Sequence, residues 1–237
     1  MWIAHFAPAL ALKPFFPNLP MWALAMAGSL PDAIFFVNAM LGIEEFRYSP
    51  TLNLRGCFPY ANEYPYSHSL VGEVIMAAGF AVLYTAFFTK TWSTVPMTDV
   101  LALFFVTSTH YILDATTHRP DMVLTPSSSK AHGTSLFDSP STMFILELGL
   151  MALAATPYLR YTSQKPTASG LRRNAPRILA ALFVVEQLQF CYLGAPTTNT
   201  RWVHAPMFLS TILTTVALMS WVDGTRVIGS DDGKKQL

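Results

Sequence analysis

The chain has 237 residues, of which 52% are hydrophobic and only 12% are charged, about half the charged share of an ordinary soluble domain. Its formal net charge is +1, so it lacks the basic excess of a nucleic-acid-binding protein. An aromatic share of 13% excludes a disordered chain, and two cysteines cannot make a disulfide-rich secreted scaffold. The composition leaves a soluble protein with a large core or a membrane protein.

Six apolar segments decide between these two classes. A helix needs about 20 apolar residues to cross a hydrocarbon core of about 30 Å, whereas helices of a soluble bundle carry polar stripes. The segments here carry isolated polar residues rather than stripes. We therefore predict an all-α, polytopic helical membrane protein with about six transmembrane helices. In chain order the spans are 19–41, 69–88, 99–118, 140–160, 177–195 and 203–222. Residues 1–228 form a single integral membrane domain, and 229–237 a disordered polar tail.

The basic residues orient the chain. An even number of spans puts both termini on one side, and the loops of that side hold ten lysines and arginines, against five in the opposite loops. The positive-inside rule therefore predicts a multi-pass protein with both termini in the cytoplasm. The two long loops of the outer side, 42–67 and 119–139, are irregular, and such loops are often functional.

The N-terminal segment 2–12 is apolar but too short to cross a membrane. Residues 13–18 then read as a turn. Residues 1–12 also lack the basic start of a cleavable signal peptide. We predict a short re-entrant helix that folds back on the first span and brings His5 to the depth of Asp32.

Ionisable residues inside spans are expensive and usually functional. Most of those here fall at one predicted depth, near the outer interface. His110, Asp114 and His118 follow the spacing i, i+4, i+8, which places them on one face of the third span. A histidine and an aspartate one turn apart are suitable ligands for a divalent metal. The full set is Asp32, Glu73, His110, Asp114, Glu147 and Glu186, with His68 and His118 at span ends.

Five sequence strings occur in an order that indicates a family. They are Ile-Ala-His-Phe-Ala around His5, Leu-Pro-Asp ending at Asp32, Tyr-Pro-Tyr-Ser-His-Ser-Leu around His68, His110 to Asp114 running on to Thr-His-Arg-Pro-Asp at 117–121, and residues 133–140 leading into a helix with Glu147. Over residues 1–160 the chain resembles a family of inner-membrane proteins described as membrane-bound metal-dependent hydrolases. The N-terminal half of that family distantly resembles the His and Asp ligand pattern of helical zinc-dependent phospholipase C.

The resemblance implies a metal held by His5, Asp32, His68, His110 and Asp114. His118 and Asp121 would then be surrounding groups or part of a second metal site. Mixed nitrogen and oxygen ligands suit zinc best, with manganese or iron possible. Asp121, Glu147 or Glu73 would serve as general base, and Arg119 would bind a phosphate or carboxylate oxygen. The expected function is hydrolysis of an amphipathic or lipid-like ester or phosphoester by a metal-activated water.

Other functions and roles stay open at this stage. The same residues would suit a metal-assisted isomerase or cyclase acting on a hydrophobic substrate, a transporter with a proton relay, or a structural protein with a relict site. Three residues also have structural alternatives. In these, His118 only caps the third span, Glu147 bridges to Ser141 or Thr142, and Glu186 joins two helices. The expected partners are the membrane and a lipid or hydrophobic small molecule. No nucleic acid or protein partner is indicated, and no disulfide is expected between Cys57 and Cys191.

Overall fold

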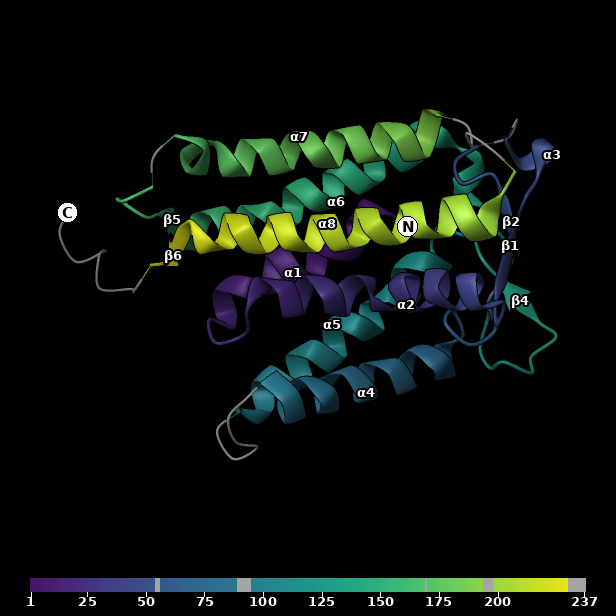
Figure 1. The fold of residues 1–237 in the computed structure, drawn as a ribbon, viewed down its shortest axis with the longest axis horizontal. Helices are drawn as coiled ribbons and strands as arrows, with labels where there is room; N and C mark the ends of the chain where they lie inside the picture. Colours follow the sequence, from purple (N-terminus) through teal and green to yellow (C-terminus); the bar gives the residue numbers. More distant parts are fainter. Residues whose placement is uncertain (54–55, 89–94, 169, 194–197, 230–237) are drawn as a thin grey trace.

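A computed structural model describes the chain except for residues 54–55, 89–94, 169, 194–197 and 230–237. Long helices run side by side along the longest axis of the molecule (Figure 1), which confirms the all-α class. They are α2 (Met21–Leu41), α4 (Leu70–Phe88), α5 (Met97–Ala115), α6 (Pro140–Tyr161), α7 (Leu171–Tyr192) and α8 (Ala205–Gly224). A π-helical turn, η5 (Thr200–His204), runs directly into α8.

The N-terminal segment forms a helix and a turn, as the sequence indicated. It consists of η1 (Ile3–Phe6), α1 (Ala7–Leu12) and η2 (Lys13–Phe15). Lys13 closes the turn, because its Nζ atom donates to the carbonyls of Pro17 at 3.2 Å and Leu19 at 2.7 Å. The chain then returns as α2 beside this segment. At Gly28 the two backbones touch, and a Cβ there would lie 2.1 Å from the carbonyl oxygen of His5.

Short strands and turns cover one end of the helices. Strands β1 (Glu45–Tyr48) and β2 (Tyr60–Glu63) form an antiparallel hairpin around the short helix α3 (Pro50–Asn53). The second long loop adds β3 (Met122–Val123), β4 (Ala131–His132) and η4 (Leu136–Asp138). At the opposite end, β5 (Thr162–Gln164) pairs with β6 (Arg226–Ile228) (Figure 1).

Aromatic packing joins the hairpin to the helices. Phe36 of α2 stacks on Phe208 of α8 with ring centroids 5.0 Å apart. Phe46 of β1 lies against both Phe36 and Tyr60, and the hydroxyl of Tyr60 contacts the buried His204 of η5. Buried aromatic pairs of this kind add to the stability that burial of their area already gives. The outer loops are therefore a packed cover rather than loose connections.

Four of the described helices are long and apolar enough to cross a membrane. They correspond to the first, second, fourth and sixth predicted spans: Met21–Leu41, Leu70–Phe87, Pro140–Tyr161 and Thr200–Gly224. Helices α5 and α7 form where the third and fifth spans are predicted, but polar residues lower their mean hydropathy. The chain is thus indicated as a membrane protein, with fewer clear spans than predicted.

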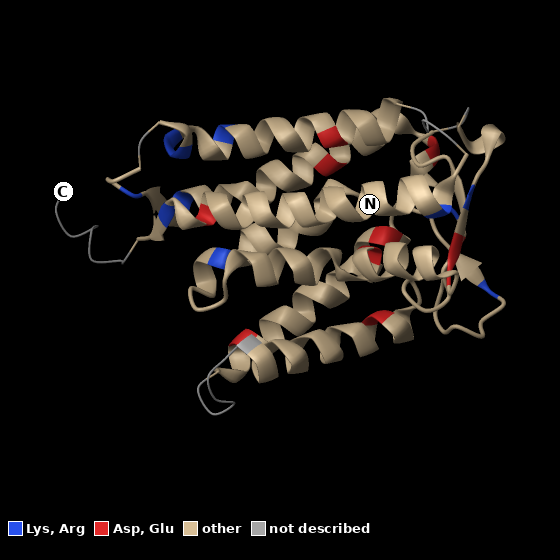
Figure 2. Cartoon of the chain, in the orientation of Figure 1, with Lys and Arg blue, Asp and Glu red and all other residues tan. Residues whose placement is uncertain are grey.

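The boundaries of the predicted spans shift in the structure. The third span is predicted to end at residue 118, but α5 ends at Ala115, so His118 lies in the turn that follows. The end of the fifth span at 194–195 and the tail from 230 lie outside the described residues. Basic segments gather mainly at the end that carries β5 and β6, while the covered end mixes both signs (Figure 2).

Candidate metal centre

The five predicted ligands lie together, although they come from four parts of the chain. His5 belongs to η1, Asp32 to α2, His68 to the turn before α4, and His110 and Asp114 to α5. All five are buried. Each of the three imidazoles contacts both carboxylates through its Nε2 atom. The distances to Asp114 are 3.1 Å from His5, 3.6 Å from His68 and 3.2 Å from His110, and those to Asp32 are 3.8, 3.2 and 3.8 Å in the same order.

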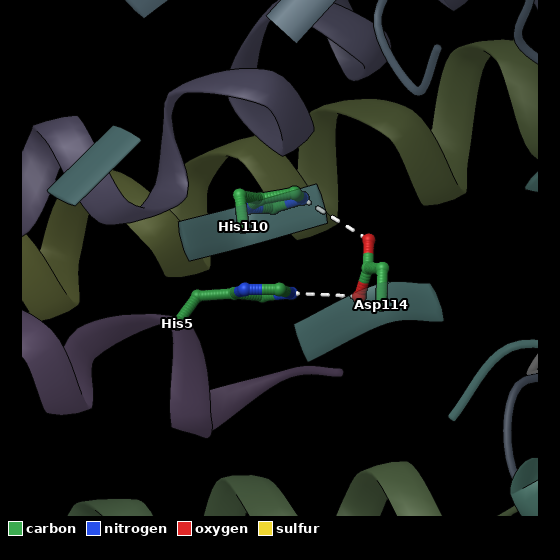
Figure 3. A group of neighbouring side chains, drawn as sticks. All are labelled: His5, His110 and Asp114. Carbon is green, nitrogen blue, oxygen red and sulfur yellow. Dashed lines mark ion pairs between the residues drawn. The ribbon is translucent and has the colours of Figure 1, made fainter. Parts of the chain in front are cut away.

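Two overlapping groups in this cluster could hold a metal ion. One consists of His5, His110 and Asp114, and the other of Asp32, His68 and His110, with donor atoms within 4.8 Å of one another in each group. In Figure 3 the His5 and His110 rings lie parallel and point to the Asp114 carboxylate. Their centroids are 3.7 Å apart, with 12° between the ring planes.

Hydrogen bonds behind the rings fix which nitrogen faces the cluster. The Nδ1 of His110 lies 2.8 Å from the carbonyl oxygen of Gly28, which can only accept, so Nδ1 carries the hydrogen. In the neutral ring the lone pair then sits on Nε2, which faces the two carboxylates. The Nδ1 of His68 lies 2.8 Å from the Ser67 hydroxyl, which can donate or accept and orients the ring in either case. Histidines that bind metals are usually oriented by such contacts.

His118 is a fourth imidazole at the edge of the cluster. Its Nε2 lies 3.3 Å from Asp114 Oδ1, and its Nδ1 lies 2.8 Å from the Tyr64 hydroxyl and 3.3 Å from Asp121 Oδ1. It therefore contacts the Asp114 side chain, and no described hydrogen bond joins its ring to a carbonyl at the end of α5. This geometry matches the role of surrounding group that the resemblance implied better than the helix-capping alternative.

The amino group of Met1 also enters the cluster and forms an ion pair with Asp114. The carbonyl of Met1 lies 3.1 Å from His5 Nε2. Asp114 supplies the counter-charge of this buried amine.

Several buried atoms of the cluster have no hydrogen-bond partner among the described residues. They include Nε2 of His110 and Oδ2 of Asp114, which lie 3.2 Å apart. When His110 is neutral with its hydrogen on Nδ1, both atoms are acceptors, and two buried acceptors facing each other are costly. A divalent cation between the histidines and the carboxylates would satisfy both, so the residues present fit a metal.

Asp121 contacts the cluster through His118. Its Oδ1 contacts His118, and its Oδ2 accepts a hydrogen bond from Asn62 at 3.1 Å. Burial alone would raise the pKa of Asp121. The hydrogen bonds from His118, Tyr64 and Asn62, together with the charge of His118, outweigh burial and lower this pKa below its ordinary value.

The other two acids predicted as general bases have different surroundings. The Oε2 atom of Glu147 accepts hydrogen bonds from the backbone N–H groups of Trp2 at 2.8 Å and Ala4 at 3.0 Å. Glu147 thus holds the segment that carries His5, a positioning role that the sequence did not indicate. Glu73 is fully buried in the first turn of α4, and neither oxygen has a hydrogen-bond partner among the described residues.

The expected role of Arg119 needs correction. Its Nε donates to Asp138 at 2.8 Å, and its two terminal nitrogens donate to the carbonyls of Phe58 and Cys57 at 3.0 Å each. The guanidinium fork that would bind a phosphate is directed at the protein itself. Arg119 therefore clamps the two outer loops to each other.

A narrow cavity of about 20 Å³ reaches the cluster, with Asp32, His68 and His118 in its lining. This is room for about one water molecule. Tyr64 and Ser67, which orient the histidines, were not singled out from the sequence, although both belong to the string around His68. No family model, curated protein or solved structure matches this chain, so the resemblance rests on its sequence motifs alone.

Proposed function

We propose that this protein is a metal-dependent membrane hydrolase that acts on an amphipathic or lipid-like ester or phosphoester. One observation carries the proposal. Four imidazole Nε2 atoms and two aspartates meet in one buried cluster, and three of the rings are oriented through Nδ1 by a carbonyl or a hydroxyl. Such preorganised nitrogen and oxygen donors are typical of a catalytic metal site.

The residues that would hold the ion are His5, Asp32, His68, His110 and Asp114, with His118 beside them. Zinc fits this donor set best, and manganese or iron would also suit it. The bound metal would supply an activated water at neutral pH. Asp121 is the candidate general base, because its carboxylate contacts His118 at the edge of the cluster.

The finer membrane topology is also part of the proposal. We infer that α5 and α7 cross the membrane with the other four helices, that the N-terminal segment is re-entrant, and that both termini lie in the cytoplasm. Large apolar side chains on the outer faces of both helices support their placement in lipid. Phe105 of α5 is 57% exposed and Val185 of α7 is 59% exposed.

Metal analysis of the purified protein tests the proposal. We expect stoichiometric metal in the wild type and its loss in His68→Ala and His110→Ala. The matched control is His132→Ala, because this histidine lies outside the cluster and contacts Tyr111. Wild-type protein without stoichiometric metal would overturn the proposal.

Product mass then separates hydrolysis from the alternatives. The metal-loaded protein is incubated with a panel of amphipathic esters and phosphoesters. Hydrolysis adds one water to the substrate, whereas an isomerase or cyclase leaves its mass unchanged. A transporter would move a solute across proteoliposomes after chelation, and that result would also contradict the proposal.

A further inference from the structure

Three cavities of the described chain share lining residues near the cluster. An outer cavity of about 650 Å³ lies among the hairpin and the second long loop, and a lateral cavity of about 220 Å³ lies between α7 and α8. The central cavity beside the cluster shares Asn62 and Tyr64 with the outer cavity. It shares Trp2, Phe58 and Phe190 with the lateral cavity. The central cavity, whose lining includes His68 and His118, therefore borders both of the other cavities.

The outer cavity and the lateral cavity differ in chemistry. The outer cavity is lined by polar and charged side chains, among them Glu44, Glu63 and Arg201. The lateral cavity is lined mainly by apolar ones, including Leu193 and Phe208. Leu193 is 66% exposed at the edge of α7, where a spanning helix would meet lipid.

We propose that the lateral cavity between α7 and α8 holds the single apolar chain of an amphipathic substrate. The polar end of that substrate faces the central cavity beside the cluster, which the lateral cavity borders at Trp2, Phe58 and Phe190. This inference rests on the proposed function and names its substrate class. A single chain is favoured because about 220 Å³ is smaller than a cleft for a drug-sized ligand, which is about 300–1,000 Å³.

Glu186 provides an independent observation in the same cavity. The residue is 5% exposed and lines the lateral cavity. Its Oε1 accepts a hydrogen bond from Thr215 at 2.8 Å, while its Oε2 has no partner among the described residues. An acceptor left alone beside an apolar chain is costly. The chain that fits this cavity therefore carries a hydrogen-bond donor, a hydroxyl or an amide N–H, at the level of Glu186.

Photolabelling in lipid nanodiscs tests the chain site. The probe is an ether-linked lysophosphocholine with a diazirine at mid-chain, and the labelled peptides are mapped by mass spectrometry. We expect saturable labelling within α7 and α8 that unlabelled lysophosphocholine competes away. Thr211→Phe places a bulky ring in the cavity and should reduce this labelling by about fivefold or more.

The matched control is Thr214→Phe, because Thr214 lies on the same helix but on its exposed face. This variant should label like the wild type. Equal labelling of the two variants, or labelling that does not saturate, would overturn the chain site. A probe with a hydroxyl on the chain should compete better than the plain chain in the wild type, but not in Glu186→Leu. Equal competition in the wild type would refute the donor assignment.

Metal content is measured on the same samples, so that the two proposals fail separately. Stoichiometric metal without saturable labelling would overturn the chain site and leave the hydrolase standing. Saturable labelling without metal would overturn the hydrolase and show a lipid-binding site alone.

Discussion

The position of His5 depends on Gly28, and replacing this glycine tests the whole arrangement of the cluster. The ideal Cβ of an alanine at Gly28 would lie 2.1 Å from the His5 carbonyl oxygen, and ordinary contacts begin at 3.4 Å. The two backbones must therefore separate by about 1.3 Å, the difference between these distances. The obstructing atom belongs to the backbone, so a side-chain rotation cannot relieve the overlap.

This displacement is large compared with what a metal site tolerates. Metal–ligand distances in a working site vary by only about 0.2 Å. The carbonyl of Gly28 also orients His110, so the substitution disturbs two ligands at once. We expect Gly28→Ala to weaken metal binding by about tenfold or more, comparable to the loss of an orienting contact.

The assay compares metal affinity, from competition with a chelator, with helix content from circular dichroism. The control is Gly79→Ala in α4, where an added Cβ meets no atom within 4 Å. Because alanine is favoured over glycine within a helix by about 0.5–1 kcal/mol, the control should bind metal normally and be no less stable. If Gly28→Ala kept wild-type affinity with unchanged helix content, the inferred role of His5 as a ligand would be wrong.

The remaining predictions concern residues that support the cluster. Glu147→Ala leaves two backbone donors unpaired, at about 1–3 kcal/mol each, so the N-terminal segment should exchange its amide hydrogens faster and metal affinity should fall. Glu147→Gln retains an acceptor and should lose less, and equal losses in both variants would contradict this role. Ser67→Ala should weaken metal binding about tenfold by releasing His68, whereas Ser49→Ala in the hairpin should not. Arg119→Lys should lower thermal stability by about 2 kcal/mol without changing metal stoichiometry, and metal loss at unchanged stability would argue against a clamp.

Much of the helical architecture could be predicted from the sequence, because the hydrophobic pattern that specifies each helix lies within a short segment of the chain. Hydrophobic segments placed six helices, and all six form, although only four are apolar enough to be clear spans. The proximity of His5 and Asp32 was also accessible, because counting residues from a turn fixes relative depth. The spacing of His110 and Asp114 fixed their common face in the same way.

The roles of Glu147 and Arg119 could not be predicted because they depend on contacts between distant parts of the chain. The hydrogen bonds of Glu147 join residues 143 and 145 positions apart, and those of Arg119 join two loops. A carboxylate and a guanidinium in a candidate site suggest chemistry when only the sequence is known. The structure shows that the same groups can be occupied in holding the site together.

The cost of burying charge explains why so many polar side chains are needed to hold the cluster together. Asp32 and Asp114 lie among apolar helices, where an unpaired carboxylate is strongly unfavourable. Four histidines and an amino group face them, and other polar groups hold these in place, so polar contacts extend outward through Ser67, Glu147 and the loops. The central cavity has room for only about one water molecule. A site so enclosed keeps bulk water from the cluster. The two long loops, whose residues Asn62, Tyr64 and Phe137 line this cavity, therefore serve the cluster as its cover.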